Sequence, residues 1–170
     1  LEPSSAASDV YKRQQNILST AKHFPGHGDT SKDSHKTLPT IKHKRKRILK
    51  TELYPYKKLI ENGLPAIMVA HLEVPSLEKE KNLPSSLSKD IIKILKKNLK
   101  FKGLIITDAL NMSGVTNYKK NNIDLMAFLA GNDILLMSND PTLGISKIKE
   151  ALNSGNITME RLENLSLIHI

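Results

Sequence analysis

The 170-residue sequence contains no cysteine and no tryptophan, and only 4% of its residues are aromatic. The lack of cysteine excludes disulfide scaffolds, Cys-ligated zinc and a thiol nucleophile, and it leaves the redox compartment undetermined. No run of about 18 or more apolar residues occurs, so the sequence predicts no membrane-spanning helix. The apolar share of 39% is enough for a core, and the length suits a single domain.

Positive charge is in excess, because 26 lysines and arginines stand against 17 acidic residues, a formal net charge of +9. Only residues 42–47 form a compact basic block. Proteins that bind nucleic acids usually combine such charge with aromatic side chains, which are scarce here. We therefore interpret the block as a solvated helix face and predict no nucleic-acid partner. A non-catalytic nucleic-acid binder that uses residues 42–47 is the alternative from a different functional class.

The two ends differ in character from the middle of the chain. Residues 1–14 are polar and aperiodic, without the basic start and apolar stretch of a signal peptide, and residues 165–170 form a short apolar tail. We predict that both ends are non-native or disordered and that the domain spans residues 15–164. The first residue is not methionine. We therefore expect the true N-terminus to be absent, which leaves the localisation open.

Between the ends, short apolar runs alternate with amphipathic segments. Strands are predicted at residues 17–22, 66–70, 104–107 and 134–137, and helices at about 44–62, 88–103, 123–130 and 143–153. Ser88 is placed to cap the second helix, and Gly63 to end the first. The wholly apolar run at 66–70 is typical of a strand buried on both faces. The pattern predicts an α/β fold with four β/α units and a parallel sheet. Four units are enough for a doubly wound sheet but not for a complete eight-stranded barrel.

Polar residues gather just after the predicted strands. They are Lys22, His23, His27, Asp33 and His35 after the first strand, His71 after the second, Asp108 after the third, and Ser138, Asn139 and Asp140 after the fourth. The carboxyl ends of parallel strands meet at one edge of the sheet, where catalytic groups of α/β folds collect. This distribution therefore predicts an active-site rim. For any single residue, ordinary solvated loop polarity is the alternative.

The segment 22–35 is the richest in chemistry. Pro25, Gly26 and Gly28 favour a tight path that lets the backbone approach a ligand closely. Lys22 and His23 are able to donate hydrogen bonds to sugar or carboxylate oxygens. Asp33 and His35 are two residues apart, so a turn would let the carboxylate orient the imidazole as a proton shuttle. The same histidines with Asp33 would also suit a metal, which is the alternative.

Asp108 stands at the end of the apolar run 104–107, with no neighbouring basic residue. A carboxylate in such a place is costly to desolvate unless it has a partner or a chemical task. Capping of the loop that follows is the alternative role.

Three motifs together resemble the family 3 glycoside hydrolases, and within them the bacterial β-N-acetylhexosaminidase (β-N-acetylglucosaminidase) branch. They are KHFPGHGDTSKDSH at residues 22–35, AIMVAH at 66–71 and GLIITDALNM at 103–112, in the order of that family. The resemblance implies a partial TIM (β/α)8 barrel, in which about four β/α units supply strands five to eight. It also implies a bacterial protein, cytoplasmic or periplasmic, and a missing N-terminal half of the barrel without which the fragment is inactive.

The resemblance further implies residue roles. Asp108 matches the family's nucleophile, His35 its unusual histidine acid/base, and Asp33 the partner of that histidine. Lys22 and His23 match residues that hold the hydroxyls of N-acetylglucosamine, and His27 and His71 are assigned to the same substrate-binding group. No metal and no organic cofactor are expected. The implied substrate is terminal β-linked N-acetylglucosamine on peptidoglycan-derived fragments.

Three other enzyme activities remain as alternatives. A β-glucosidase of the same superfamily would lack the Asp33-Ser34-His35 element, whereas a phosphorylase would keep it, because a histidine tolerates an incoming phosphate better than a carboxylate does. A metallohydrolase would use His23, His27, Asp33 and His35 as ligands and would lose activity to chelators.

Overall fold

The computed structural model describes residues 11, 14–15, 17–28, 30, 37–118 and 122–167. Three parallel strands form its sheet in the order β1-β2-β3: β1 (Thr20–Phe24), β2 (Ala66–Val69) and β3 (Leu104–Thr107). The helical segments are α2 (Arg45–Arg47), η1 (Ile48–Glu52), α3 (Tyr54–Glu61), η2 (Ser85–Leu87), α4 (Lys89–Lys93), η3 (Ile94–Asn98), α5 (Ser113–Thr116), α6 (Ile123–Ala130), α7 (Pro141–Asn153) and α8 (Met159–Leu167).

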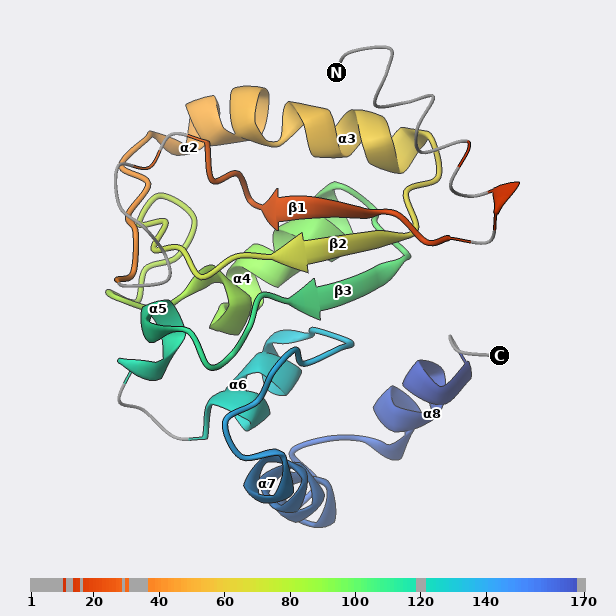
Figure 1. Cartoon of the computed structure of the whole chain (residues 1–170). Helices are drawn as coiled ribbons and strands as arrows, with labels where there is room; N and C mark the ends of the chain where they lie inside the picture. Colours follow the sequence, from red (N-terminus) through yellow and green to blue (C-terminus); the bar gives the residue numbers. More distant parts are fainter. Residues whose placement is uncertain are drawn as a thin grey trace.

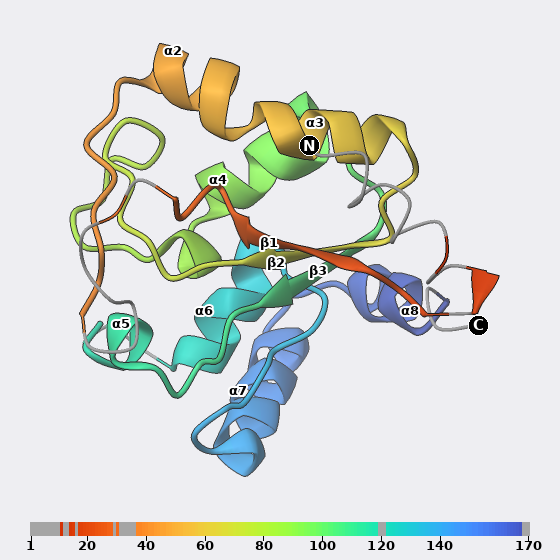
Figure 2. The ribbon, with the colours of Figure 1, turned by 45° about the horizontal axis from the view of Figure 1, so that its top comes forward.

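The strands lie side by side and point the same way, with α3 beside β1 at one end of the fold and α7 beyond β3 at the other (Figure 1; Figure 2). Helices connect successive parallel strands, as the alternating sequence pattern predicts. The first strand begins and ends later than predicted, at Thr20 and Phe24. Its pairing with β2 is irregular between Ala21 and Phe24, at the point where Lys22 and His23 lie.

The predicted fourth strand at 134–137 is wrong as a regular strand. Ile134 forms only an isolated parallel bridge with Ile106. The chain still follows β3, because Thr107 N–H donates to Ile134 O at 3.0 Å. Leu136 N–H, however, donates to the Thr107 hydroxyl at 2.9 Å. A side-chain oxygen thus takes the place of a backbone acceptor and interrupts the ladder.

The end of the first predicted helix and the start of the second agree with the capping signals, but the second helix ends at Asn98 and not at the predicted residue 103. The predicted helix at 44–62 forms as α2, the π-helical segment η1 and α3, and Gly63 follows it with a left-handed φ of 76°. Ser88 caps α4, since its hydroxyl oxygen accepts the Ile91 N–H at 3.1 Å. Leu87 and Ile92, which stand before and after this cap at the positions of a hydrophobic staple, are both buried.

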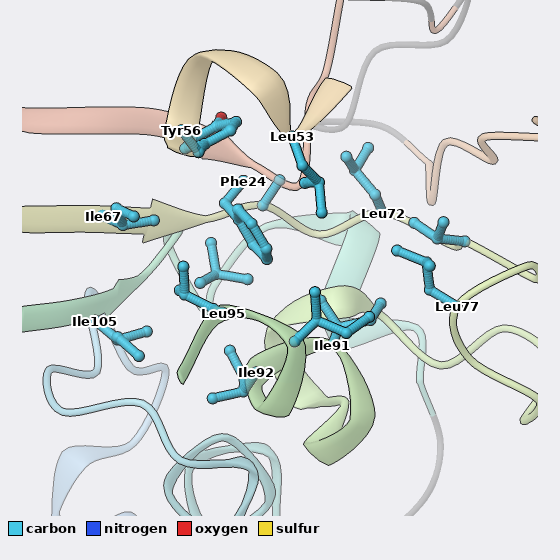
Figure 3. Close-up of a cluster of buried hydrophobic side chains, with 14 of the residues drawn as sticks. Phe24, Leu53, Tyr56, Ile67, Leu72, Leu77, Ile91, Ile92, Leu95 and Ile105 are labelled. Carbon is cyan, nitrogen blue, oxygen red and sulfur yellow. The ribbon is translucent and has the colours of Figure 1, made fainter. Parts of the chain in front are cut away.

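Helices α3 and α4 form the main core with one face of the sheet. Ile67 of β2 and Ile105 of β3 are fully buried among these helices (Figure 3). Phe24 packs edge-on against Tyr56 of α3, with 5.2 Å between ring centroids. On the opposite face, the registered pair Met68 and Ile106 is only half-buried. The burial of 66–70 on both faces is therefore incomplete at Met68, because the helices pack on one side.

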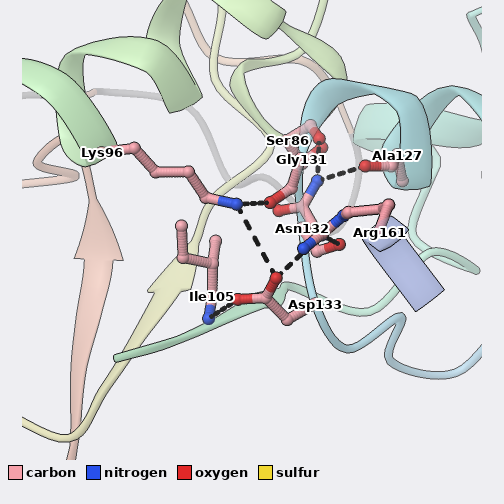
Figure 4. Close-up of polar contacts among 8 residues, drawn as sticks. All are labelled: Ser86, Lys96, Ile105, Ala127, Gly131, Asn132, Asp133 and Arg161. Carbon is pink, nitrogen blue, oxygen red and sulfur yellow. Dashed lines mark hydrogen bonds and ion pairs between the residues drawn. The ribbon is translucent and has the colours of Figure 1, made fainter. Parts of the chain in front are cut away.

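A polar network joins the start of β3 to the C-terminal helices (Figure 4). Asp133 accepts the Ile105 N–H at 2.9 Å through one carboxylate oxygen. Its other oxygen lies 2.8 Å from the Arg161 guanidinium of α8 and 3.7 Å from the Lys96 ammonium. Helix α8 extends to Leu167, into the predicted 165–170 tail, and Leu165 packs on the cluster formed around Phe128. In the described part of the chain, no helix is both long and apolar enough to cross a membrane.

Candidate active site

Three of the predicted site residues meet at the carboxyl edge of the sheet. His23 is the fourth residue of β1, His71 lies two residues after β2, and Asp108 follows β3 directly. The strands are parallel, so their ends share one edge, and residues far apart in sequence become neighbours there. This convergence is the geometry that the distribution of polar residues predicts.

Asp108 lies at this edge, directly after β3. Its backbone N–H donates to Val69 O at 2.8 Å and continues the pairing of the strand ends. One carboxylate oxygen, Oδ1, accepts the Ala109 N–H at 2.9 Å, while Oδ2 lies 3.9 Å from His23 Nε2. The side chain is 15% exposed. One oxygen is therefore held by the loop, as the capping alternative requires, and the other faces a partly exposed imidazole.

His27 lies beside His23, with 5.9 Å between the ring centroids in an edge-to-face arrangement. The Thr30 hydroxyl donates to His27 O at 3.0 Å and is 2.8 Å from His27 Nδ1. A hydroxyl has one proton, so a donor to the carbonyl must accept from Nδ1–H. His27 Nε2 is then the acceptor nitrogen of the neutral ring.

His71 is fully buried, with 0% exposure. Its Nε2 lies 2.9 Å from Ala109 O and its Nδ1 lies 2.7 Å from Ser86 Oγ. A carbonyl oxygen only accepts, so Nε2 carries the proton and the Ser86 hydroxyl donates to Nδ1. Burial lowers the pKa of His71, against the opposing effects of the Ala109 carbonyl and the Asp108 charge. The ring is therefore neutral and both nitrogens are engaged inside the protein.

Lys22 is exposed on β1 and has no hydrogen bond or ion pair with Asp108. It lines a cavity of about 550 Å³ between β1 and α3, together with Arg47 and Glu52. The structure thus brings His23 next to Asp108 and His27 next to His23, and it places Lys22 at a neighbouring opening.

Asp33 and His35 fall within residues 31–36, outside the described residues. Among the residues that the structure describes, no group of three or more His, Asp, Glu or Cys side chains is arranged to hold a metal ion.

The residues that follow the bridge at Ile134 have structural partners. Asp140 caps α7, with Oδ1 accepting the Leu143 N–H at 2.9 Å. Ser138 Oγ accepts the Asp140 N–H at 3.2 Å. Ser86, by contrast, joins the site through His71 without having been predicted. Its only signal was its place in a serine-rich stretch before a helix, which is indistinguishable from ordinary capping sequence.

The geometry defines an α/β protein with histidines and one carboxylate at the carboxyl edge of a parallel sheet. Residues 10–167 match the family described as Glycosyl hydrolase family 3 N terminal domain. The chain therefore belongs to glycosyl hydrolase family 3, whose N-terminal domain is a TIM-barrel-like α/β fold.

Named relatives agree with this family. The chain is 38% identical over 134 residues to a β-hexosaminidase A of Pseudoalteromonas piscicida, a match that covers 71% of the chain and 22% of the relative. It is 34% identical to a β-hexosaminidase of Glaesserella parasuis, over 92% of the chain and 46% of the relative. The chain thus spans less than half the length of these relatives.

Solved structures are similar as well. A family 3 β-N-acetylglucosaminidase from Paenibacillus sp. str. FPU-7 aligns with a TM-score of 0.82 and 34% identity, over 92% of the chain and 30% of that structure. A β-glucoside phosphorylase aligns with a TM-score of 0.84 and 30% identity, over 92% of the chain and 30% of that structure.

Proposed function

We propose that this chain carries the nucleophile of a retaining β-N-acetylhexosaminidase that removes terminal β-linked N-acetylglucosamine. The observation that carries the proposal is the placement of Asp108, with Oδ1 held by the Ala109 N–H and Oδ2 facing His23 at the edge where three strands end. A carboxylate fixed through one oxygen presents the other for attack on the anomeric carbon. The names of the similar hexosaminidases support this reaction class.

The reaction follows as two displacements. In the first, Asp108 Oδ2 bonds to the anomeric carbon, the bond from that carbon to the leaving oxygen breaks, and protonated His35 gives its proton to that oxygen. In the second, water attacks the same carbon, its proton passes to His35, and the bond to Asp108 breaks. Two inversions at one carbon retain the configuration of the sugar.

The acid/base pair of the proposal rests on the sequence element Asp33-Ser34-His35. Most glycosidases use a second carboxylate in this role. A neutral imidazole avoids charge repulsion with the nucleophile and titrates at about pH 6.5 before perturbation, which suits proton transfer near neutrality. Asp33 would orient and charge this imidazole.

Lys22, His23 and His27 are proposed to hold the sugar hydroxyls. The position of His23 beside Asp108 would place a bound hydroxyl next to the attacking oxygen. We also propose that the chain supplies strands five to eight of the barrel and that turnover needs the remaining strands. The chain alone should then show no hexosaminidase activity, whereas the reading frame extended upstream of Gln14 should be active. Full activity of the chain by itself would contradict this part of the proposal.

The central test is Asp108→Asn in the extended protein. The amide keeps the shape of the side chain but removes the nucleophile, so turnover should fall by several orders of magnitude on an aryl N-acetylglucosaminide while the fold is retained. The matched control is Asp140→Asn, since Asp140 is a carboxylate at the same edge that caps α7. A mechanism-based fluorosugar should label Asp108 in the wild type. Turnover near the wild-type rate in Asp108→Asn would end the proposal.

The acid/base assignment has its own test. His35→Ala should reduce hydrolysis of natural disaccharides far more than hydrolysis of aryl glycosides with acidic phenols, because a good leaving group departs without a proton. Asp33→Ala should act in the same direction but less. Equal losses on both substrates, accompanied by loss of a bound metal and sensitivity to chelators, would favour the metallohydrolase instead.

Phosphorolysis is the second candidate, favoured by the similarity to a β-glucoside phosphorylase. In that reaction phosphate, not water, would attack the glycosyl-enzyme. Product analysis with and without phosphate separates the two. Hydrolysis predicts free N-acetylglucosamine both with and without phosphate, whereas phosphorolysis predicts the sugar 1-phosphate. The natural substrates that we propose are peptidoglycan-derived fragments.

A further inference from the structure

A chain of buried polar contacts lies directly behind Asp108. The Ser86 hydroxyl donates to His71 Nδ1 at 2.7 Å, and His71 Nε2–H donates to Ala109 O at 2.9 Å. The Ser86 carbonyl is itself held by Asn132, whose side-chain amide donates to it at 2.8 Å. Ser86 and His71 are both fully buried. This network of polar contacts is therefore anchored in the protein interior, away from any substrate.

The contacts converge on one residue, Ala109. Its N–H holds Asp108 Oδ1, and its carbonyl is held by His71. The next amide, Leu110 N–H, donates to Leu136 O at 2.8 Å. The peptide that joins Ala109 to Leu110 is thus fixed at both ends. The Ala109 N–H belongs to the preceding peptide, between Asp108 and Ala109, so the fixed peptide restrains this N–H, and the carboxylate that it holds, through the two backbone rotations at Ala109.

The Ala109 carbonyl determines which nitrogen of His71 carries the proton, because a carbonyl oxygen only accepts. If Nδ1 carried it, the lone pair of Nε2 would face the lone pairs of the Ala109 carbonyl oxygen and the bond would be lost. The Ser86 hydroxyl donates to the unprotonated Nδ1, so the second nitrogen of the buried ring is also satisfied and the ring is held from both sides. Burial also opposes a protonated ring.

We propose that His71 and Ser86 are positioning residues that fix the Asp108 carboxylate with Oδ1 turned to Ala109 and Oδ2 turned to the substrate. The inference rests on the proposed function only in taking Asp108 as the nucleophile. It also changes the predicted role of His71, from a residue that binds the sugar to one that acts through the Ala109 backbone.

The structural part is tested on the chain itself by amide hydrogen exchange measured with NMR. His71→Leu removes both ring nitrogens, and Ser86→Ala removes the hydroxyl that donates to Nδ1 and holds the ring in place. Each should speed exchange at Ala109 and Leu110 by about fivefold or more, the equivalent of one lost hydrogen bond. His71→Gln keeps an N–H near the position of Nε2 and should restore much of the protection.

The control is Ser85→Ala. Ser85 is also fully buried, but its hydroxyl donates to Ala70 O at 2.6 Å and accepts the Leu72 N–H at 3.2 Å, so it bonds to the backbone beside His71 and not to the His71 ring. Exchange at Ala109 and Leu110 should stay near the wild-type rate in this variant. Uniform acceleration of all amides by His71→Leu and Ser86→Ala, or no change at Ala109 and Leu110, would overturn the inference. If His71→Leu does not fold, Ser86→Ala and Ser85→Ala still decide it.

The catalytic part is tested in the extended protein. A misplaced nucleophile should reduce kcat by about a hundredfold in His71→Leu, since small displacements from the attack geometry have effects of that size. KM should change little, because His71 does not touch the sugar. A raised KM with kcat unchanged would show a substrate contact and overturn the inference. An inactive wild type that still shows the local exchange pattern would refute the proposed function but support the positioning role.

Discussion

Asp133 is expected to be one of the most sensitive positions for the stability of the chain. Its carboxylate side chain is only 4% exposed and has three partners from different elements. These are the Ile105 N–H of β3, the Arg161 guanidinium of α8 and the Lys96 ammonium of η3 (Figure 4). Removing the carboxylate leaves the Ile105 backbone N–H and the two cations without this partner.

The magnitude follows from those partners. An unsatisfied buried N–H costs about 1–3 kcal/mol, and breaking a buried ion pair costs about 3–5 kcal/mol in all. Arg161 also donates to Asn132 O at 2.9 Å and Lys96 to Gly131 O at 2.6 Å, so both cations keep one acceptor. We therefore expect Asp133→Ala to lower the free energy of unfolding by about 3 kcal/mol, at the lower end of that range. Asp133→Asn retains an acceptor for Ile105 and should lose less.

The assay is urea denaturation of the chain followed by circular dichroism, with the m-value checked for a two-state transition. Glu150→Ala is the matched control. Glu150 pairs with Lys147 at 2.7 Å on the surface of α7, where water replaces the lost contact, so its removal should leave the transition unchanged. A free energy of unfolding for Asp133→Ala within about 1 kcal/mol of the wild-type value would refute the reasoning, because it would mean that the buried network contributes no more than a surface pair.

Three further predictions concern single residues. Gly103→Ala should destabilise the chain strongly in the same assay, because a Cβ there would lie 2.2 Å from Pro65 O. Gly28→Ala should be tolerated, because a Cβ at Gly28 would have no atom within 4 Å. Equal effects of the two variants would contradict this prediction. Ser88→Ala should lower the free energy of unfolding by about 1 kcal/mol or more, because the Ser88 hydroxyl caps α4 and also donates to Glu78, and Ser88→Thr, which keeps the hydroxyl, should recover part of it. Burial lowers the pKa of His71. Below about pH 6.5 the unfolded state therefore binds more protons than the folded state. The free energy of unfolding should then fall as the pH drops through and below that value. Urea titrations between about pH 7 and 5 should show this slope reduced in His71→Gln, and an unchanged slope would exclude His71 as its source.

The sequence alone determined the order of strands and helices in most of the fold. Apolar runs at 66–70 and 104–107 and the signals at Gly63 and Ser88 are local, since they depend on residues a few positions apart. The structure confirms β2, β3, the end of α3 before Gly63 and the start of α4 after Ser88. The same local reasoning predicted a fourth strand at 134–137. It failed there because the competing partner, the Thr107 hydroxyl, comes from 29 residues earlier in the chain.

Tertiary structure decided how the candidate site works. Parallel pairing explains why His23 and Asp108, which are distant in sequence, come within 3.9 Å. The sequence pattern predicts that both lie at the carboxyl edge of the sheet, but it does not predict the distance between them. The sequence could not predict the role of His71, because a histidine that follows a strand gives the same sequence pattern whether its side chain faces a substrate or the protein interior. Burial and two contacts, with Ser86 fifteen residues later and Ala109 thirty-eight residues later, make it a neutral donor to the backbone behind Asp108.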